Sequence, residues 1–416
     1  MNINKKYDLI VFGATGFTGS LVIKYLIQTY GLNNPRFKWA IAGRDKNKLK
    51  NLKESFIHID PKSVEIDTFI ADSYDSKSLD IMTASCSVII STVGPYLEYG
   101  LSLIKSCVKN KTNYCDLTGE VPFIRESIDI FHEEARKNKC RIIHSCGFDS
   151  IPSDIGVLFL QKNYIAKYDK LCEKVNLYVE GIKGGLSGGT IASMVSIMKY
   201  LRLNPEKRSI LKSPFSLDPD VIMSNGLQEH ALKSIRWDKS IKKWTCPFLM
   251  SGINTRIVRR TNAITGFSYG KNFNYNEMSS YNKGLNGFLN ALMMLVTLVA
   301  LQITISSKLL FIILKKMVLP KPGEGPSKNK MRNGFFRMKI IGFTDQLAKI
   351  IVTVNGDSDP GYSATAKMLT ETAISMILNE NKLPKAYGVL TPASGIGLVL
   401  INRLKDKGIS FTVEQN

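Results

Sequence analysis

The stretch YDLIVFGATGFTGSLVIKYLIQTY, residues 7–30, decides the fold of this chain. An apolar β-branched run leads into glycines spaced G-x-x-G-x-x-G, and an amphipathic helical pattern follows. Such a turn lets the backbone approach a pyrophosphate, whose charge the N-terminus of the following helix stabilises. The stretch therefore predicts a dinucleotide-binding turn made of Gly13, Ala14, Thr15, Gly16, Phe17, Thr18 and Gly19.

Five more short β-branched runs follow, in alternation with longer helical patterns. Together the six predicted strands are Tyr7 to Phe12, Lys38 to Ala42, Glu65 to Ala71, Ser87 to Ser91, Asn113 to Asp116 and Arg141 to Ser145. This alternation is typical of a doubly wound parallel sheet with crossover helices. It predicts an α/β fold whose N-terminal Rossmann domain spans residues 1–147.

The rest of the chain divides by composition. Residues 148–283 have longer, less regular pieces and predict an α+β domain for substrate binding and dimerisation. Residues 284–318 form an apolar segment. A loop rich in proline and glycine, Leu319 to Ser327, opens the final region, residues 319–416. We expect this region to hold the remainder of the second domain. Its predicted elements are a strand near Lys349 to Asn355, a helix from Tyr362 to Leu378, and a helix after Pro392 that returns to the first domain.

The apolar segment carries no charged residue from Gly284 to Ser307 and is long enough to span a bilayer. Lysines flank it, and their long side chains reach a headgroup layer: Lys283, Lys308, Lys315 and Lys316. We expect association with a membrane or a lipid droplet. The alternatives are a helix buried in the second domain, a lid over a lipid pocket, and a hairpin that enters one leaflet.

The net charge of +21 is compatible with an anionic membrane surface or with solvated lysines. Its clusters are Arg256 with Arg259 and Arg260, Lys315 with Lys316, and Lys328 with Lys330 and Arg332. Without a helix-turn-helix, zinc-finger or RNA-binding signature, nucleic acid is not expected as a partner. Seven scattered cysteines without a C-x-x-C pair favour reduced thiols in a cytosol-facing protein. No signal peptide precedes the first strand, so secretion is not expected. The four histidines lie far apart in the sequence and predict no metal site.

The ends of the next strands predict further cofactor contacts. Arg44, after the second strand, suits the 2′-phosphate of NADP, although the adjacent Asp45 keeps NAD possible. Asp72, after the third strand, is expected to accept a hydrogen bond from adenine or, alternatively, to cap the helix near Ser76. The loop after the fourth strand is expected to contact the cofactor through Thr92, Val93, Gly94 and Pro95.

These motifs resemble the saccharopine dehydrogenase-like oxidoreductases, a family that includes the trans-acting enoyl reductases. The resemblance runs from end to end through Gly13–Gly19, Ala42–Arg44, Thr92–Tyr96, Tyr114–Glu120, Cys146–Pro152, Gly188–Thr190, Pro322–Ser327, Asp359–Tyr362 and Leu390–Ser394. It implies an NAD(P)-dependent oxidoreductase linked to lipid metabolism, including glycolipid biosynthesis. The segment Val354–Asp359 departs from the family's shorter glycine–aspartate run, which leaves the role of that loop open.

The proton donor is less legible. No tyrosine is followed by a lysine four residues later, which disfavours short-chain dehydrogenases, and hydrolase motifs are missing. Candidates by position are Tyr96, Asp116, Glu120, Asp149 and the neighbouring Ser150. Each candidate also has a structural alternative. Tyr96 would pack in the core, Asp116 would form a turn, and Glu120 would cap the helix near Val121. Asp149 and Ser150 would form the N-cap of the helix after Pro152.

These observations predict an NADPH-dependent reductase of a lipid-like enoyl or keto substrate. Two alternatives stay open. One is a membrane or lipid-droplet scaffold that keeps the dinucleotide fold without turnover. The other is a soluble amino-acid dehydrogenase, which would need arginine or lysine clamps in the second domain and an apolar segment that does not insert.

Overall fold

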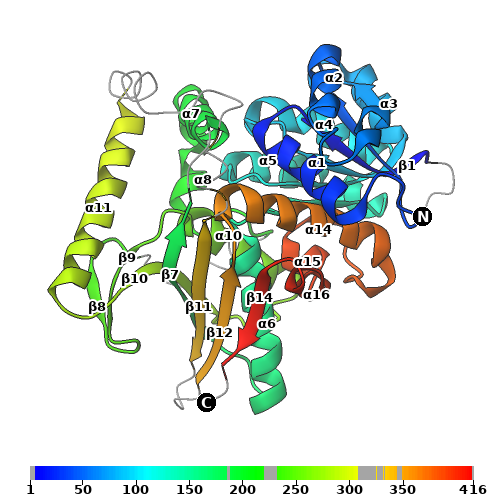
Figure 1. The fold of residues 1–416 in the computed structure, drawn as a ribbon. Helices are drawn as coiled ribbons and strands as arrows, with labels where there is room; N and C mark the ends of the chain where they lie inside the picture. Colours follow the sequence, from blue (N-terminus) through cyan, green and yellow to red (C-terminus); the bar gives the residue numbers. More distant parts are fainter. Residues whose placement is uncertain are drawn as a thin grey trace.

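The computed structural model describes residues 5–184, 188–219, 232–307, 325, 331, 333–343 and 349–414. Within them the chain forms two seven-stranded sheets, each with helices packed on it (Figure 1). The first sheet is entirely parallel, in the order β13-β6-β5-β4-β1-β2-β3. Its strands are β1 Tyr7–Phe12, β2 Trp39–Gly43, β3 Thr68–Ile70, β4 Cys86–Ser91, β5 Asn113–Asp116, β6 Arg141–Ile143 and β13 Gly388–Leu390.

Apolar side chains on both faces of β1 place it at the centre of this sheet. Leu9 and Val11 belong to one core, Ile10 and Phe12 to the other, and all four are buried. A strand buried on both faces reads as a continuous apolar run, as β1 does. Helices α1 (Phe17–Tyr30) and α14 (Thr365–Leu378) pack on one face of the sheet. Helices α3 (Ser76–Ala84), α4 (Tyr96–Lys109) and α5 (Val121–Lys137) pack on the other face. Strand β2 is joined to β3 by α2 (Lys46–Glu54) and the 3₁₀ turn η1 (Pro61–Glu65).

The predicted α/β class is confirmed, and all six predicted strands are present. The third is shorter than predicted, because Asp60 caps η1 and holds residues 61–65 in a helical turn. The sixth ends at Ile143, since Ser145 has a positive φ of 60°. The seventh strand, β13, was missed. It has only three residues and pairs with β6 across most of the chain length, so it leaves no local pattern.

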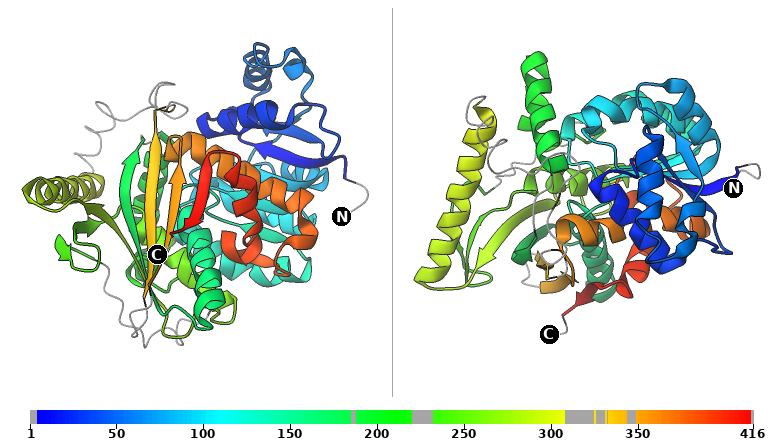
Figure 2. Two further views of the ribbon diagram at one scale, coloured as in Figure 1. Left: turned by 60° about the horizontal axis from the view of Figure 1, so that its bottom comes forward. Right: turned by 45° about the horizontal axis from the view of Figure 1, so that its top comes forward.

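The second sheet is mixed, in the order β14-β12-β11-β7-β10-β9-β8. Only the pair β7–β10 is parallel. The strands are β7 Lys174–Lys183, β8 Arg236–Asp238, β9 Lys243–Pro247, β10 Asn274–Tyr281, β11 Phe335–Phe343, β12 Lys349–Gly356 and β14 Ile409–Val413. Helices α6 (Ile151–Tyr168) and α10 (Ser251–Ile264) cover one face of it, between the two sheets (Figure 2).

The remaining elements join or flank the two sheets. They are α7 Gly188–Leu203, η2 Pro205–Lys207, α8 Arg208–Lys212, α11 Leu285–Ser306, the π-helical turn η3 Pro360–Ala364, η4 Glu380–Lys382, α15 Pro392–Gly395 and α16 Val399–Lys405. Helix α14 begins at Thr365 rather than Tyr362, because η3 precedes it. The apolar segment is helical as α11, which packs against β9 and β10; its predicted continuation from 308 to 318 and most of the loop 319–327 lie outside the described residues.

The arginine cluster on α10 does not add to a surface field. Arg256, Arg259 and Arg260 are buried, and they donate hydrogen bonds to main-chain carbonyls, among them those of Leu211, Tyr275 and Val389. A buried guanidinium is tolerated when its donors find acceptors. These three arginines are therefore not available to an anionic partner at the surface. The lysine clusters at 315–316 and 328–332 lie outside the described residues.

Candidate functional site

The glycine turn after β1 has the geometry of an anion site. Gly13 has a φ of +85°, and a Cβ there would lie 2.7 Å from Thr92 Oγ1 and 2.8 Å from Val93 Cγ2. A Cβ on Gly19 would lie 2.2 Å from the Gly13 carbonyl oxygen. These two positions admit only glycine. Thr92 holds the turn from the β4 side by donating to the carbonyls of Phe12 and Gly13, both at 3.1 Å.

The N-terminus of α1 opens onto this turn without a side-chain cap. Its N-cap residue is Gly16, and the first helical turn contains no acidic residue. A Cβ at Gly16 would have one close neighbour, the Gly13 carbonyl oxygen at 3.2 Å. Uncapped amides at a helix N-terminus attract a phosphate group. The residues present thus fit the pyrophosphate of a dinucleotide.

Next to this turn, the end of β2 separates Arg44 from Asp45. Asp45 is the N-cap of α2, and its carboxylate accepts from the Lys48 amide at 3.0 Å. Arg44 is exposed and makes no ion pair with a described residue. Because Asp45 is occupied and Arg44 is free, this corner suits a 2′-phosphate better than a pair of ribose hydroxyls.

A pair of tyrosines near the carboxyl edge of the sheet, Tyr74 after β3 and Tyr99 in α4, was not anticipated from the sequence. Tyr74 is 75% exposed, and its ring meets that of Tyr99 edge to face at 5.6 Å. Burial raises the pKa of Tyr99, and the positive charge of Arg44 opposes that shift. Aromatic rings and a guanidinium provide faces on which an adenine can stack. Tyr74 and Tyr99 are 25 positions apart in the sequence, so no local pattern indicates that their rings meet.

Asp72 lies in the loop between β3 and α3. One carboxylate oxygen accepts from the Tyr74 amide at 2.9 Å, and its own amide donates to Ser78 Oγ at 3.1 Å. Asp75, rather than Asp72, caps α3 by accepting from Lys77. The alternative that Asp72 caps this helix is therefore wrong, and the predicted contact with adenine stays a prediction.

The β4 loop carries a cis peptide bond between Gly94 and Pro95. Gly94 is exposed, whereas Thr92, Val93 and Pro95 are partly buried, so the backbone of this loop borders the open edge of the sheet. Tyr96 points the other way. Its hydroxyl donates to the Ser91 carbonyl at 3.1 Å, and its ring packs on Phe123 at 5.6 Å. Burial raises the pKa of Tyr96 well above its ordinary value, and this tyrosine serves packing.

Asp116, at the end of β5, is fully engaged below the surface. Oδ2 accepts from Tyr114 at 2.9 Å and contacts His144 Nδ1 at 2.7 Å, while Oδ1 accepts from the amides of Thr118 and Ser145. The other ring nitrogen of His144 contacts Ser127 Oγ at 3.0 Å. With 0% exposure, Asp116 holds the β5 and β6 loops together and faces no substrate.

Glu120 caps a helix, but a different one from the helix that was expected. Its two oxygens accept from the amides of Tyr96 and Leu97, both at 2.9 Å, at the start of α4, and Ser193 of α7 donates to it at 2.5 Å. It forms no side-chain cap on α5, the helix that begins at Val121. Burial raises its pKa, and the capping hydrogen bonds oppose that shift.

Asp149 differs from the other three candidates. It lies in the loop between β6 and α6, is partly exposed, and makes no hydrogen bond with a described residue. Its Oδ2 would lie 3.7 Å from a Cβ placed on Gly119, so the missing side chain leaves room beside the carboxylate. Burial alone raises its pKa to about 6. Neither Asp149 nor Ser150 caps α6, and Ser150 donates to Asn254 at 3.1 Å.

The second domain closes the other side of this edge. Phe17 of the glycine turn packs edge to face on Tyr362 at 4.9 Å, and a Cβ on Gly325 would touch the Phe17 ring. A Cβ on Gly184 would lie 2.5 Å from Asp359 Oδ2. From two of the family motifs, Gly325 and Tyr362 therefore contact the cofactor turn; residues 322–324 and 326–327 lie outside the described residues.

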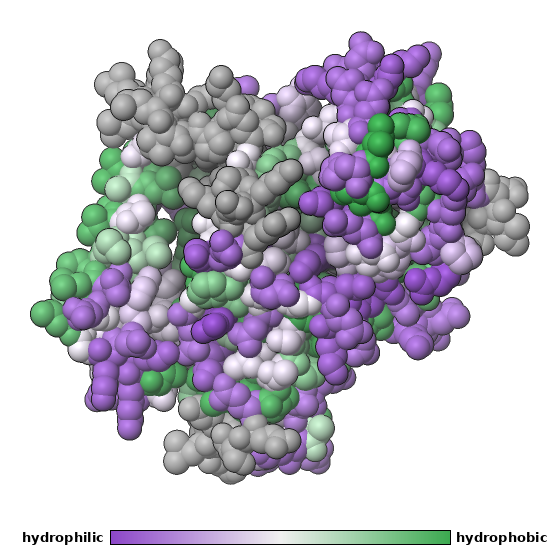
Figure 3. Space-filling view, viewed as in Figure 1, coloured by the Kyte–Doolittle hydropathy of each residue, from purple (hydrophilic) through white to green (hydrophobic). Residues whose placement is uncertain are grey.

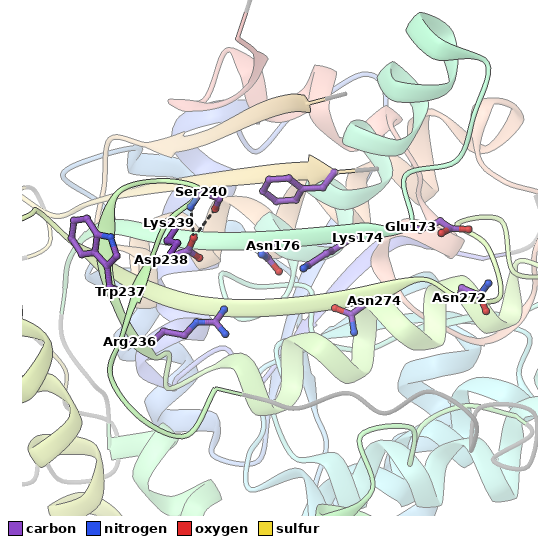
Figure 4. Close-up of a pocket in the computed structure, with 11 residues that line it drawn as sticks. Glu173, Lys174, Asn176, Arg236, Trp237, Asp238, Lys239, Ser240, Asn272 and Asn274 are labelled. Carbon is purple, nitrogen blue, oxygen red and sulfur yellow. Dashed lines mark hydrogen bonds between the residues drawn. The ribbon is translucent and has the colours of Figure 1, made fainter. Parts of the chain in front are cut away.

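A hollow of about 610 Å³ lies elsewhere, on the second sheet (Figure 4). Figure 4 shows side chains from β7, β8 and β10 along its walls, including Asn176, Arg236 and Asn274. None of the predicted site residues lines it. Among the described residues, no group of three metal-ligating side chains occurs.

Comparison with known proteins matches residues 9–143 to the saccharopine dehydrogenase NADP binding domain. A Mycobacterium tuberculosis protein assigned by name to the trans-acting enoyl reductases is 35% identical over 98% of this chain and 97% of its own length. The trans-acting enoyl reductase of the same species is 32% identical over 97% of both chains.

Solved structures share the fold across the whole chain. Apo saccharopine dehydrogenase from Saccharomyces cerevisiae matches with a TM-score of 0.52 and 14% identity, covering 98% of this chain and 99% of its own. Homospermidine synthase from Legionella pneumophila, in complex with NAD, matches with a TM-score of 0.51 and 8% identity, covering 100% and 93%. At such identities the likeness shows the fold alone.

Proposed function

Because this chain belongs to the saccharopine dehydrogenase-like oxidoreductases and is an NADP-binding enzyme of that family, we propose that it reduces a lipid-like enoyl or keto substrate. Relatives along the whole chain are named trans-acting enoyl reductases, which supports an enoyl group as the first choice. NADPH, when bound, supplies a hydride to an electron-poor carbon of the substrate. The protein's part is to hold cofactor and substrate at the open edge of the first sheet, and to provide a proton.

Helix α11 is the observation that carries the lipid part of the proposal. Its outward side chains are apolar and exposed, including Leu285 at 71%, Met293 at 65% and Val296 at 58%. Figure 3 shows hydrophobic residues gathered along the edge of the molecule where α11 lies. Only 11% of its most apolar window is buried, which argues against the alternative of a core helix. An exposed apolar surface of this length indicates a lipid or protein contact.

The inner side of α11 rests on protein, which favours an in-plane position on a cytosol-facing membrane or lipid droplet. Ala291 is buried against the domain, and Phe288 packs on Trp244 at 5.2 Å. A helix attached to β9 and β10 along one side offers lipid only its other side, as interfacial helices do. Exposed Trp237 and Lys283 near its N-terminus suit a headgroup layer.

The arginines of α10 do not support the amino-acid dehydrogenase alternative. It calls for cationic clamps, yet the arginines of α10 are buried on main-chain carbonyls and reach no open surface. The scaffold alternative, a dinucleotide fold without turnover, makes the opposite prediction about catalysis and is separated by experiment.

The experiment follows NADPH oxidation with trans-2-enoyl and 3-keto thioesters of increasing chain length. We expect consumption of NADPH in preference to NADH, and a kcat/KM that rises with chain length. Tight NADPH binding without turnover of any of these substrates would favour the scaffold alternative.

Flotation with phosphatidylglycerol vesicles tests the lipid surface. The unmodified protein is expected to float, and V296K to remain at the bottom, because an ammonium group then enters the apolar side of α11. The matched control is Q302K, which adds the same charge at an exposed polar position of the same helix. Equal flotation of all three proteins would contradict the proposed contact.

A further inference from the structure

The carboxyl ends of β4, β5 and β6 form one continuous edge. Ser91 pairs with Asp116, and Cys115 pairs with Ile143, so the three following loops leave the sheet side by side. The strand order reverses between β1 and β4, and ligands of open α/β sheets bind at such a switch point. With the pyrophosphate at the β1 turn and Arg44 at β2, the reacting end of a dinucleotide extends toward the β4–β6 side.

Of the three acidic candidates Asp116, Glu120 and Asp149, only the last is open to a ligand. Asp116 is fully enclosed, and both oxygens of Glu120 are held by the first turn of α4. Asp149 is partly exposed and has no hydrogen-bond partner among the described residues. Partial removal of a carboxylate from water without a hydrogen-bond partner costs free energy. A carboxylate found in this state therefore indicates a functional role rather than a structural one.

The surroundings of Asp149 contain little that would stabilise the charge of its carboxylate. Gly119 contributes no side chain, and Oδ2 lies 3.7 Å from the position of a Cβ there. Glu120 and Asp116, the nearest acids along the β5 loop, are turned into their own hydrogen bonds, and across the edge Asp359 accepts from the Tyr362 amide.

We propose that Asp149 is the proton donor of the reaction, which rests on the proposed function. Once the β-carbon of the enoyl group has gained a hydride, the electron pair of the double bond moves onto the carbonyl as an enolate. The O–H bond of Asp149 breaks, its proton bonds to the α-carbon, and the enolate closes to the saturated carbonyl product. The resulting carboxylate takes a proton from water before the next turnover.

The protonation of this carboxyl suits the role. Because burial raises its pKa to about 6, a useful fraction of Asp149 is protonated near neutral pH, whereas an ordinary aspartate would be almost fully ionised. The rate should therefore decline as pH rises above about 6.

Asp149→Asn tests the proposal, with Asp75→Asn as the matched control, because Asn caps α3 as well as Asp. For D149N we expect kcat to fall at least about 100-fold, with unchanged NADPH affinity and an unchanged KM. The residual activity should lose its decline above pH 6. In deuterium oxide, the unmodified enzyme should place deuterium on the α-carbon of the product.

A second measurement needs neither substrate nor cofactor. Infrared difference spectra of the unmodified protein against D149N should show one carboxyl that titrates near pH 6. Gly119→Ala places a methyl group beside Oδ2 and should move that titration upward. Full activity of D149N with an unchanged pH profile would overturn the proposal, and so would the lack of this titration. If no enoyl or keto lipid is reduced, the proposed function fails, and the spectra still decide the state of Asp149.

Discussion

Along the carboxyl edge of the first sheet, the half formed by β1, β2 and β3 leaves its polar groups open, whereas the half formed by β4, β5 and β6 buries most of its own. Thr15 and Arg44 are exposed at the first half. Asp116 and Glu120 are fully enclosed at the second. The first half offers uncapped backbone amides and one exposed cation, whereas the carboxylates of Asp116 and Glu120 in the second half hold loops and helices in place.

The largest effect should come from removing a carboxylate of the closed half. Asp116→Ala leaves Tyr114, His144 and two buried amides without their acceptor, and we expect a loss of about 4 kcal/mol in the free energy of unfolding. Asp72→Ala, the matched change in the open half, should cost less than about 1 kcal/mol. Urea denaturation measures both, and equal losses would break the comparison.

Charge at the open half should act on the cofactor rather than on the fold. Gly16→Asp places a carboxylate at the uncapped N-terminus of α1, where it repels the pyrophosphate, and we expect NADPH affinity to fall about 100-fold, or about 2.7 kcal/mol. Gly16→Asn has nearly the same shape without the charge and should lose far less. Cofactor fluorescence gives both dissociation constants, and tight NADPH binding by G16D would exclude this turn as the phosphate site.

Asp149 should behave as the exception in the closed half, since it has no partner to lose. Its folded-state pKa of about 6 lies above its ordinary value of 3.8, so the ionised form is the costly one in the fold. Stability of the unmodified protein should therefore fall as pH rises from about 4 to 6. Allowing for its partial exposure, D149N should be about 1–2 kcal/mol more stable at pH 8, with no gain near pH 4. Thermal unfolding at the two pH values checks the sign.

The smallest effect should come from Arg44→Ala, at the exposed corner of the open half. Loss of one solvent-exposed pair with a 2′-phosphate should weaken NADPH binding about tenfold, or about 1.4 kcal/mol, and leave NADH binding unchanged. The same titration serves for both cofactors. Parallel losses for NADPH and NADH would assign Arg44 to adenine stacking and remove its part in the selection of NADP.

The elements of the open half could be predicted from the sequence because they are marked by local features. The glycine spacing from Gly13 to Gly19 follows a strand and opens a helix, and Arg44 comes directly after the next strand. Each of these is visible within a few residues. Tyr74 and Tyr99 were missed because their contact joins the loop after β3 to helix α4.

The closed half could not be resolved in the same way. Tyr96, Asp116, Glu120 and Asp149 all follow strands, and position alone makes them equivalent candidates. Their partners distinguish them: Glu120 caps α4 from 24 positions away, and Asp116 contacts His144 across β6. The burial of Arg260 could not be predicted for the same reason. A charged residue is expected at the surface, and the acceptor of Arg260, the Val389 carbonyl, lies far away in the sequence.

Strand β13 gives the enzyme a particular order of assembly during synthesis. The ribosome completes β1 to β6 early, but the edge strand that pairs with β6, and α14, which packs on β4 and β5, emerge more than 200 residues later. Until then the nascent first domain holds an apolar face without cover, which is the kind of surface that chaperones bind. A fragment that ends at residue 147 should therefore aggregate. A truncation or a disruptive substitution near the C-terminus should destabilise the cofactor domain at the opposite end of the chain.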